Sequence, residues 1–115
     1  MWLRVALNKD AVRYNDAVGY SYIDGPACEE YYFDRTVADA LEKDGFLTEM
    51  WDRFDALFDW GDCDFFLPDK CRAFKTWLEA RLQKDIDPVI RPVYEVMLDY
   101  AGKAVAYDTG LSFDF

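Results

Sequence analysis

The chain has 115 residues, which is enough for one domain with a single hydrophobic core. Its hydrophobic content of 52% and its aromatic content of 18% argue against a disordered chain. Its formal net charge of −10 repels nucleic acid phosphate and anionic membrane surfaces, and it favours encounter with a basic partner.

The absence of histidine limits the chemistry that this chain can perform. Without an imidazole there is no Ser-His or Cys-His catalytic pair and no histidine ligand for zinc. The three cysteines, Cys28, Cys63 and Cys71, are an odd number, and the N-terminus lacks the apolar run of a secretory signal. No uninterrupted apolar stretch is long enough to cross a bilayer. We therefore expect a cytoplasmic protein with reduced thiols, no metal and no cofactor.

The first third of the chain contains two strand patterns. Residues 2–7 alternate in hydropathy and predict a strand, and a second strand is expected around residues 17–23. Gly25 and Pro26 end the second strand. Residues 26–35 fit a helix or a strand, and their periodicity does not decide between the two.

Two helices are predicted in the middle of the chain. The first covers residues 37–43, with Thr36 as its N-cap, and it ends at Asp44-Gly45. The second covers residues 47–59 and ends before Gly61. Its apolar face carries Leu47, Met50, Trp51, Phe54, Leu57 and Phe58, and its opposite face carries Thr48, Asp52, Asp55 and Asp59.

The second half of the chain predicts two more helices and a hairpin. A helix over residues 68–84 has a basic face and is expected to pack antiparallel to the acidic helix 47–59. The next helix is expected to start at Asp87-Pro88, or to begin anew at Pro92 after a kink, and to end at Gly102. Its segment 93–101 is apolar on most sides, which indicates the most buried helix of the domain. The tail after Gly102 alternates on both sides of Asp108-Thr109-Gly110 and predicts a β-hairpin.

Together these patterns predict a single α+β domain over residues 1–115. About four helices in the middle of the chain pack on a small antiparallel sheet made of N-terminal and C-terminal strands.

The acidic residues between positions 52 and 64 are the candidate partner-binding site. Asp52, Asp55 and Asp59 share one predicted helix face, and Asp62 and Asp64 continue the acidic run. With Trp60 as an aromatic anchor, this set suits a partner rich in Lys and Arg. The alternative is an ordinary amphipathic helix whose carboxylates are solvated by water.

Three other groupings of residues are candidates for catalytic or metal sites. Asp108-Thr109-Gly110 matches the signature of aspartic proteases, but a turn explains the same three residues. Cys63 and Cys71 match no metal-ligand spacing, which favours buried structural cysteines. Carboxylate pairs occur by chance among 23 Asp and Glu residues. We therefore predict no catalytic residue and no metal ligand.

In size, acidity, α+β layout and lack of catalytic residues, the chain resembles bacterial immunity proteins, which are small cytoplasmic inhibitors of nuclease toxins. The nearest feature to a motif is the stretch from Gly61 to Pro68, GDCDFFLP. The resemblance implies an inhibitor, monomeric or weakly dimeric, that covers the basic active-site surface of its toxin. Phage-encoded inhibitors and nucleic-acid mimics share this profile, and a small enzyme using carboxylates or Cys63 is a further alternative.

Overall fold

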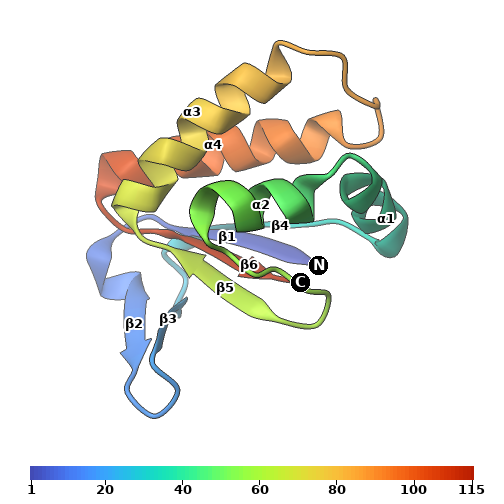
Figure 1. Ribbon diagram of the computed structural model, residues 1–115. Coiled ribbons are helices and arrows are strands. Elements are labelled where there is room, and N and C mark those ends of the chain that lie inside the picture. The colour runs from blue at the N-terminus through green and yellow to red at the C-terminus, as the bar shows by residue number, and fades with distance from the viewer.

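The computed structural model describes residues 1–115 and has the α+β architecture that the sequence predicts. Four helices lie on one face of a four-stranded antiparallel sheet, as Figure 1 shows. The helices are α1 (Arg35–Lys43), α2 (Phe46–Phe54), α3 (Pro68–Leu82) and α4 (Arg91–Tyr107). The strands of this sheet are β1 (Trp2–Ala6), β4 (Cys28–Tyr32), β5 (Cys63–Phe66) and β6 (Leu111–Asp114).

Strands from the two ends of the chain form the centre of this sheet, which confirms the prediction. The order across the sheet is β4-β1-β6-β5, and every neighbouring pair is antiparallel. The two termini therefore lie side by side (Figure 1). Alternate residues of the central strands are fully buried under the helices: Leu3, Val5, Leu111 and Phe113.

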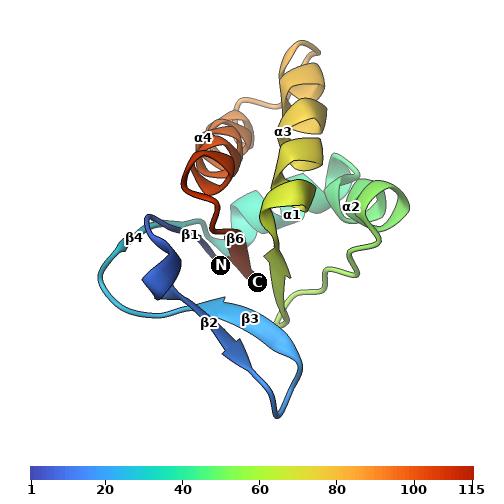
Figure 2. The ribbon, with the colours of Figure 1, turned by 90° about the vertical axis from the view of Figure 1, so that its left-hand side faces the viewer.

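A separate β-hairpin projects from the side of the sheet opposite the helices (Figures 1 and 2). It consists of β2 (Val12–Asn15) and β3 (Tyr20–Ile23), preceded by the 3-10 helix η1 (Lys9–Ala11). Gly19, with a φ of +74°, helps to close the turn between the two strands. The sequence predicts the second of these strands but not the first.

The structure settles the ambiguous segment and corrects the start of α1. Residues 28–32 form strand β4, within the range that the sequence leaves open. The N-cap of α1 is Asp34, whose side chain accepts the backbone N–H of Val37 at 3.1 Å, so the prediction of Thr36 was wrong. The predicted end of this helix is confirmed, since Gly45 follows it with a φ of +86°.

Helix α2 ends at Phe54, five residues before the predicted end. Asp55 adopts the left-handed conformation, with a φ of 53°, and closes the helix. Beyond it Ala56 and Phe58 are buried while Leu57 and Asp59 are exposed. This alternation is that of an extended segment, so the prediction of a helix through residue 59 was wrong.

Helix α3 matches its predicted range to within two residues, but its main helical neighbour is α4 and not α2. The stretch before α3, for which the sequence pattern predicts no strand, forms edge strand β5. Helix α4 begins at the turn that contains Pro92 and continues past Gly102 to Tyr107. None of the helices combines the length and the hydropathy needed to cross a membrane.

The expectation of a C-terminal hairpin was wrong, because its first half belongs to α4 and only β6 is a strand. Asp108 ends the helix in a left-handed conformation, with a φ of 56°. The Thr109 hydroxyl then donates to the carbonyl oxygen of Ala6 at 2.7 Å, which directs the chain into the sheet. The buried face predicted for α4 is confirmed: Val93, Tyr94, Met97, Tyr100 and Ala101, with Ala104 beyond them, are all buried.

Candidate partner-binding surface

The predicted site residues lie on a segment that leaves α2, crosses the surface and enters β5. We call residues 52–64 the acidic segment. Asp52 occupies the last turn of α2, and Asp55 forms the C-cap of that helix. Asp59 follows in the extended connection, Asp62 comes after the turn at Trp60-Gly61, and Asp64 lies within β5. The first four side chains are exposed, and that of Asp64 is half-buried.

None of these five aspartates forms an ion pair, although the chain contains eleven such contacts. Three basic residues of α3 pair with other carboxylates, and Lys70 forms no ion pair and lies 5.2 Å from the ring centroid of Phe66. Arg72 pairs with Asp69 at 3.1 Å, and Lys75 pairs with Glu79 at 3.7 Å. Arg81 reaches Asp44 at 2.6 Å. The neighbouring basic helix therefore leaves the acidic segment without ion-pair partners.

Two of the aspartates also bond to the backbone beside them. Asp59 Oδ1 accepts the N–H of Trp60 at 2.8 Å, and Asp64 Oδ1 accepts the N–H of Phe65 at 2.8 Å. Each carboxylate keeps its second oxygen and its charge. Asp52, Asp55 and Asp62 make no side-chain hydrogen bond within the chain, so their carboxylates are free to contact a partner.

Asp64 differs from the other four because β5 places it on the face of the sheet that carries the helices. Asp64 lies opposite Phe113, which is buried under the helices, while Cys63 and Phe65 point to the other face. Burial raises the pKa of the Asp64 carboxyl, and the Phe65 N–H and the charge of Lys70 oppose this effect only in part. The structure therefore places four of the predicted aspartates in solvent and holds the fifth against the core.

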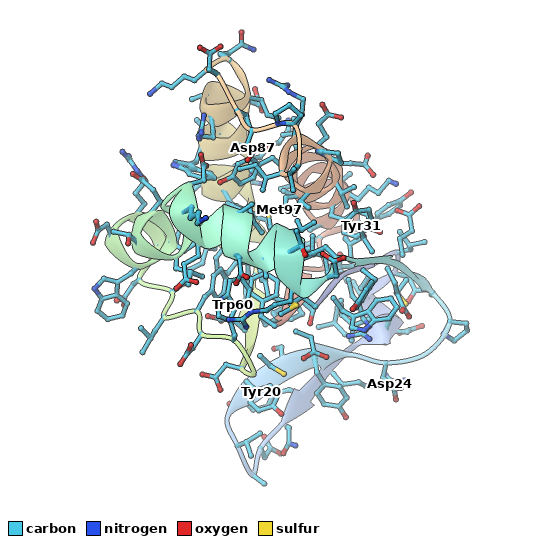
Figure 3. All side chains as sticks on the ribbon, turned by 90° about the vertical axis from the view of Figure 1, so that its right-hand side faces the viewer. Tyr20, Asp24, Tyr31, Trp60, Asp87 and Met97 are labelled. Atoms are coloured by element: carbon cyan, nitrogen blue, oxygen red, sulfur yellow. The ribbon has the colours of Figure 1, made fainter.

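Trp60 packs within the molecule instead of standing free as an anchor. Its indole Nε1 lies 3.4 Å from Glu42 Oε2 of α1. Its ring packs on Phe115, with 5.4 Å between ring centroids, and the Arg35 guanidinium lies 5.6 Å from the ring centroid. In Figure 3 the labelled Trp60 lies beside α1. Much of this side chain therefore attaches the acidic segment to the helical layer.

The structure reveals apolar contact area that the sequence assigned to the core. Trp51 is 51% exposed on the surface of α2, and Leu57 is 71% exposed in the extended segment that follows the end of this helix at Phe54. Trp51 and Leu67, which is 58% exposed, line an open groove. Its charged lining residues are the acids Asp52, Asp55 and Asp69 and the cations Arg53 and Lys70. The alternation after Asp55 is the sequence signal that could have revealed the exposure of Leu57.

The other candidate groups serve the fold or lack activation. The pKa of the exposed Cys63 thiol is raised by partial burial and by Asp114, whose Oδ1 lies 3.6 Å from the sulfur. Burial raises the pKa of the Cys71 thiol to about 12. Asp108 pairs with Lys9 at 2.9 Å and caps α4, as a turn residue does. The interpretation of buried cysteines is thus confirmed for Cys71 and wrong for Cys63.

Comparison of this chain with protein-family models, with curated proteins and with solved structures finds no match.

Proposed function

We propose that this chain is an inhibitor that binds a basic protein, as bacterial immunity proteins bind nuclease toxins. One observation carries the proposal: the five aspartates of the acidic segment form no ion pair within the chain, and four of them are exposed. Their charges contribute nothing to the fold through ion pairs, so they remain available to the Lys and Arg residues of another protein.

The electrostatics of the whole chain support this kind of partner. A net charge of −10 accelerates encounter with a cationic surface and disfavours contact with nucleic acid. A nuclease needs a cationic surface to hold the phosphates of its substrate. Covering that surface with Asp52, Asp55, Asp59 and Asp62 would block the substrate, and Trp51 and Leu67 would add apolar contact beside the charges.

The thiol chemistry gives less support to the alternative of a cysteine enzyme. A nucleophilic cysteine needs a pKa lowered by a cation or a helix N-terminus. The pKa of Cys63 is instead raised, and its nearest polar neighbour is the carboxylate of Asp114. At neutral pH this thiol is protonated and is a poor nucleophile.

The test is to isolate the partner from the host by affinity capture, and then to titrate it against charge variants. In the first variant Asp52, Asp55 and Asp59 all become Asn, which removes charge but keeps hydrogen-bond acceptors and tolerates the left-handed conformation at position 55. We expect the captured partner to be basic, its nuclease activity to be suppressed by the wild-type chain, and its binding to weaken by about 2–5 kcal/mol in calorimetry. Replacing the three aspartates by Lys should weaken binding further.

The matched control changes three other exposed aspartates to Asn: Asp10, Asp16 and Asp85. These side chains also lack ion pairs. Because three aspartates are replaced in each variant, the control changes the net charge by the same amount. It should slow association slightly and leave dissociation unchanged. Wild-type affinity in the Asp52/Asp55/Asp59 variant would remove the acidic segment from the interface. A partner without nuclease activity would contradict the toxin class while leaving the binding role intact.

A further inference from the structure

The outer edge of strand β4 presents backbone groups that no part of the chain covers. β4 pairs only with β1, in a register that places Trp2 opposite Tyr32 and Arg4 opposite Glu30. Met1 and Phe33 exchange both backbone hydrogen bonds at 3.0 Å, which fixes the phase of the ladder. Because hydrogen-bonded pairs alternate along antiparallel strands, the N–H and C=O groups of Glu30 and Tyr32 point away from β1.

No other element takes up these groups. No loop or side chain accepts the N–H of Glu30 or of Tyr32, and the pairing of β4 with β1 runs without a bulge. The strand contains no proline, which many proteins use to protect an edge. In Figure 2 β4 lies at the margin of the sheet, at the opposite edge from β5 and the acidic segment. This edge is therefore competent to pair with another strand.

The charges beside this edge specify the chemistry of that strand. On the helical face Lys103 is shared between Glu29 and Asp99, the latter at 2.9 Å. On the other face Arg4 is shared between Glu30 at 3.8 Å and Asp114 at 3.6 Å. Each face thus has two carboxylates for one cation, and each lacks one positive charge.

We propose that the β4 edge binds an extended segment with two consecutive basic residues, which adds to the sheet as a fifth strand. The first basic residue, opposite Glu30, would supply the missing cation on the outer face. The next, opposite Glu29, would supply it on the helical face, since successive side chains of a strand point to opposite faces. The segment would run antiparallel to β4, so two apolar residues would precede the basic pair, opposite Tyr32 and Tyr31. The backbone of the segment would bond to Glu30 and Tyr32, as in other cases of β-strand addition.

A second copy of this chain fits the edge poorly. Antiparallel pairing of β4 with itself over its full length is centred on Glu30, so it would place Glu30 directly opposite Glu30 of the other copy. Like charges in that position destabilise a sheet, and each copy carries a net charge of −10. The same glutamates that oppose self-association favour a cationic strand. The inference does not depend on the proposed function, because it concerns the other edge of the sheet.

The probe is the blocked pentapeptide acetyl-Val-Ile-Lys-Lys-Val-amide, titrated into ¹⁵N-labelled chain and followed by NMR. We expect saturable downfield shifts of the Glu30 and Tyr32 amides, with slowed hydrogen exchange, at up to millimolar peptide. The peptide in which both lysines are replaced by Glu should cause no shift. The Asn variant of Asp52, Asp55 and Asp59 should bind the peptide like the wild type, which separates this edge from the acidic segment.

Tyr32→Pro and Tyr32→Ala form a matched pair. Both lose the phenol ring, but only proline loses the outward N–H, a change that edge strands tolerate. We expect Tyr32→Ala to bind the peptide and Tyr32→Pro to bind it at least about tenfold more weakly. This difference corresponds to about 1.4 kcal/mol and reflects the lost hydrogen bond from the backbone N–H at position 32. If Tyr32→Pro does not fold, N-methylation of the peptide lysine opposite Glu30 removes a hydrogen bond from the other side and should have the same effect. Equal binding to both variants, shifts confined to residues 52–64, or no saturable shift at all would overturn the proposal.

Discussion

The carboxylates of this protein differ in whether their burial is compensated by charged and hydrogen-bonding partners. The Asp44 carboxylate accepts hydrogen bonds from Nη2 and Nε of Arg81, at 2.6 and 3.2 Å, and from the Tyr94 hydroxyl at 2.7 Å. Its side chain is only 16% exposed, so this network ties the end of α1 to α3 and α4. Asp64 is the opposite case, because it is half-buried without an ion pair, and the charge of Lys70 offsets its burial only in part.

This difference predicts a pH-dependent effect of Asp64→Asn. Burial raises the pKa of Asp64 above its unfolded value, so ionisation of this group costs stability as the pH rises through its folded pKa. Asparagine keeps the acceptor for the Phe65 N–H and carries no charge. We expect the variant to melt a few degrees higher than the wild type at pH 7, and the gain to disappear below the unfolded pKa, where both side chains are neutral. A gain that persists undiminished at pH 3 would show that charge is not its cause.

At the scale of elements, α4 holds the helical layer against the sheet. Its buried face lies over β1 and against α3, and the ring of Tyr94 packs against that of Trp77 with 5.9 Å between the ring centroids. Its solvent face carries an exposed row of alternating charge, in which Arg91 pairs with Glu95 at 3.8 Å and Asp99 pairs with Lys103 at 2.9 Å. Both pairs have the four-residue spacing of helical neighbours.

The two faces of α4 should respond very differently to substitution. Met97 is fully buried, so Met97→Ala should lower the free energy of unfolding by about 2–4 kcal/mol through lost contacts and a cavity. Asp99→Asn should cost less than about 0.5 kcal/mol, because its ion pair is exposed to solvent. Urea denaturation of both variants measures these values. Equal losses in the two variants would contradict the assignment of the faces.

At the scale of the whole molecule, repulsion between like charges exceeds attraction between opposite charges. The 23 acidic side chains outnumber the 13 basic ones, and the acidic segment concentrates part of the excess in one place. Long-range repulsion is screened by salt more readily than ion pairs at contact distance, since screening grows with separation. The folded state therefore gains from added salt.

We expect the melting temperature to rise by several degrees as sodium chloride increases from about 0.01 M to about 1 M, which shortens the Debye length from about 30 Å to about 3 Å. The Asn variant of Asp52, Asp55 and Asp59 removes three negative charges and should show a smaller rise. A melting temperature that falls with salt would mean that the surface ion pairs outweigh the repulsion.

The sequence predicts the features of this fold that depend on local pattern. The alternation of residues 2–7, the range of α3 and the buried face of α4 follow from hydropathy and turn residues, and the structure confirms them. The termination of α2 does not follow, because Leu57 and Phe58 continue the helical spacing past Asp55. Its end becomes visible only when the alternation from Ala56 onward is tested as an extended segment.

The candidate site was predictable in its charge but not in its environment. Solvent exposure of Asp52, Asp55 and Asp59 follows from their polar face, although two of the three lie beyond the helix. The half-burial of Asp64 depends on the pairing of β5 with β6, strands about fifty residues apart in the chain. Local periodicity carries no information on such a contact, which is why β5 itself was missed.

The position of β1 and β6 at the centre of the sheet has a consequence for biosynthesis. Synthesis on the ribosome runs from the N-terminal to the C-terminal side, so β1 emerges before β6, and β1 cannot gain its second neighbour until β6 is made. Leu111 and Phe113, which complete the core, also arrive at that late point. Between the synthesis of β1 and that of β6 the sheet and the core therefore stay incomplete, and repulsion among the aspartates of the nascent segment would help to keep it soluble.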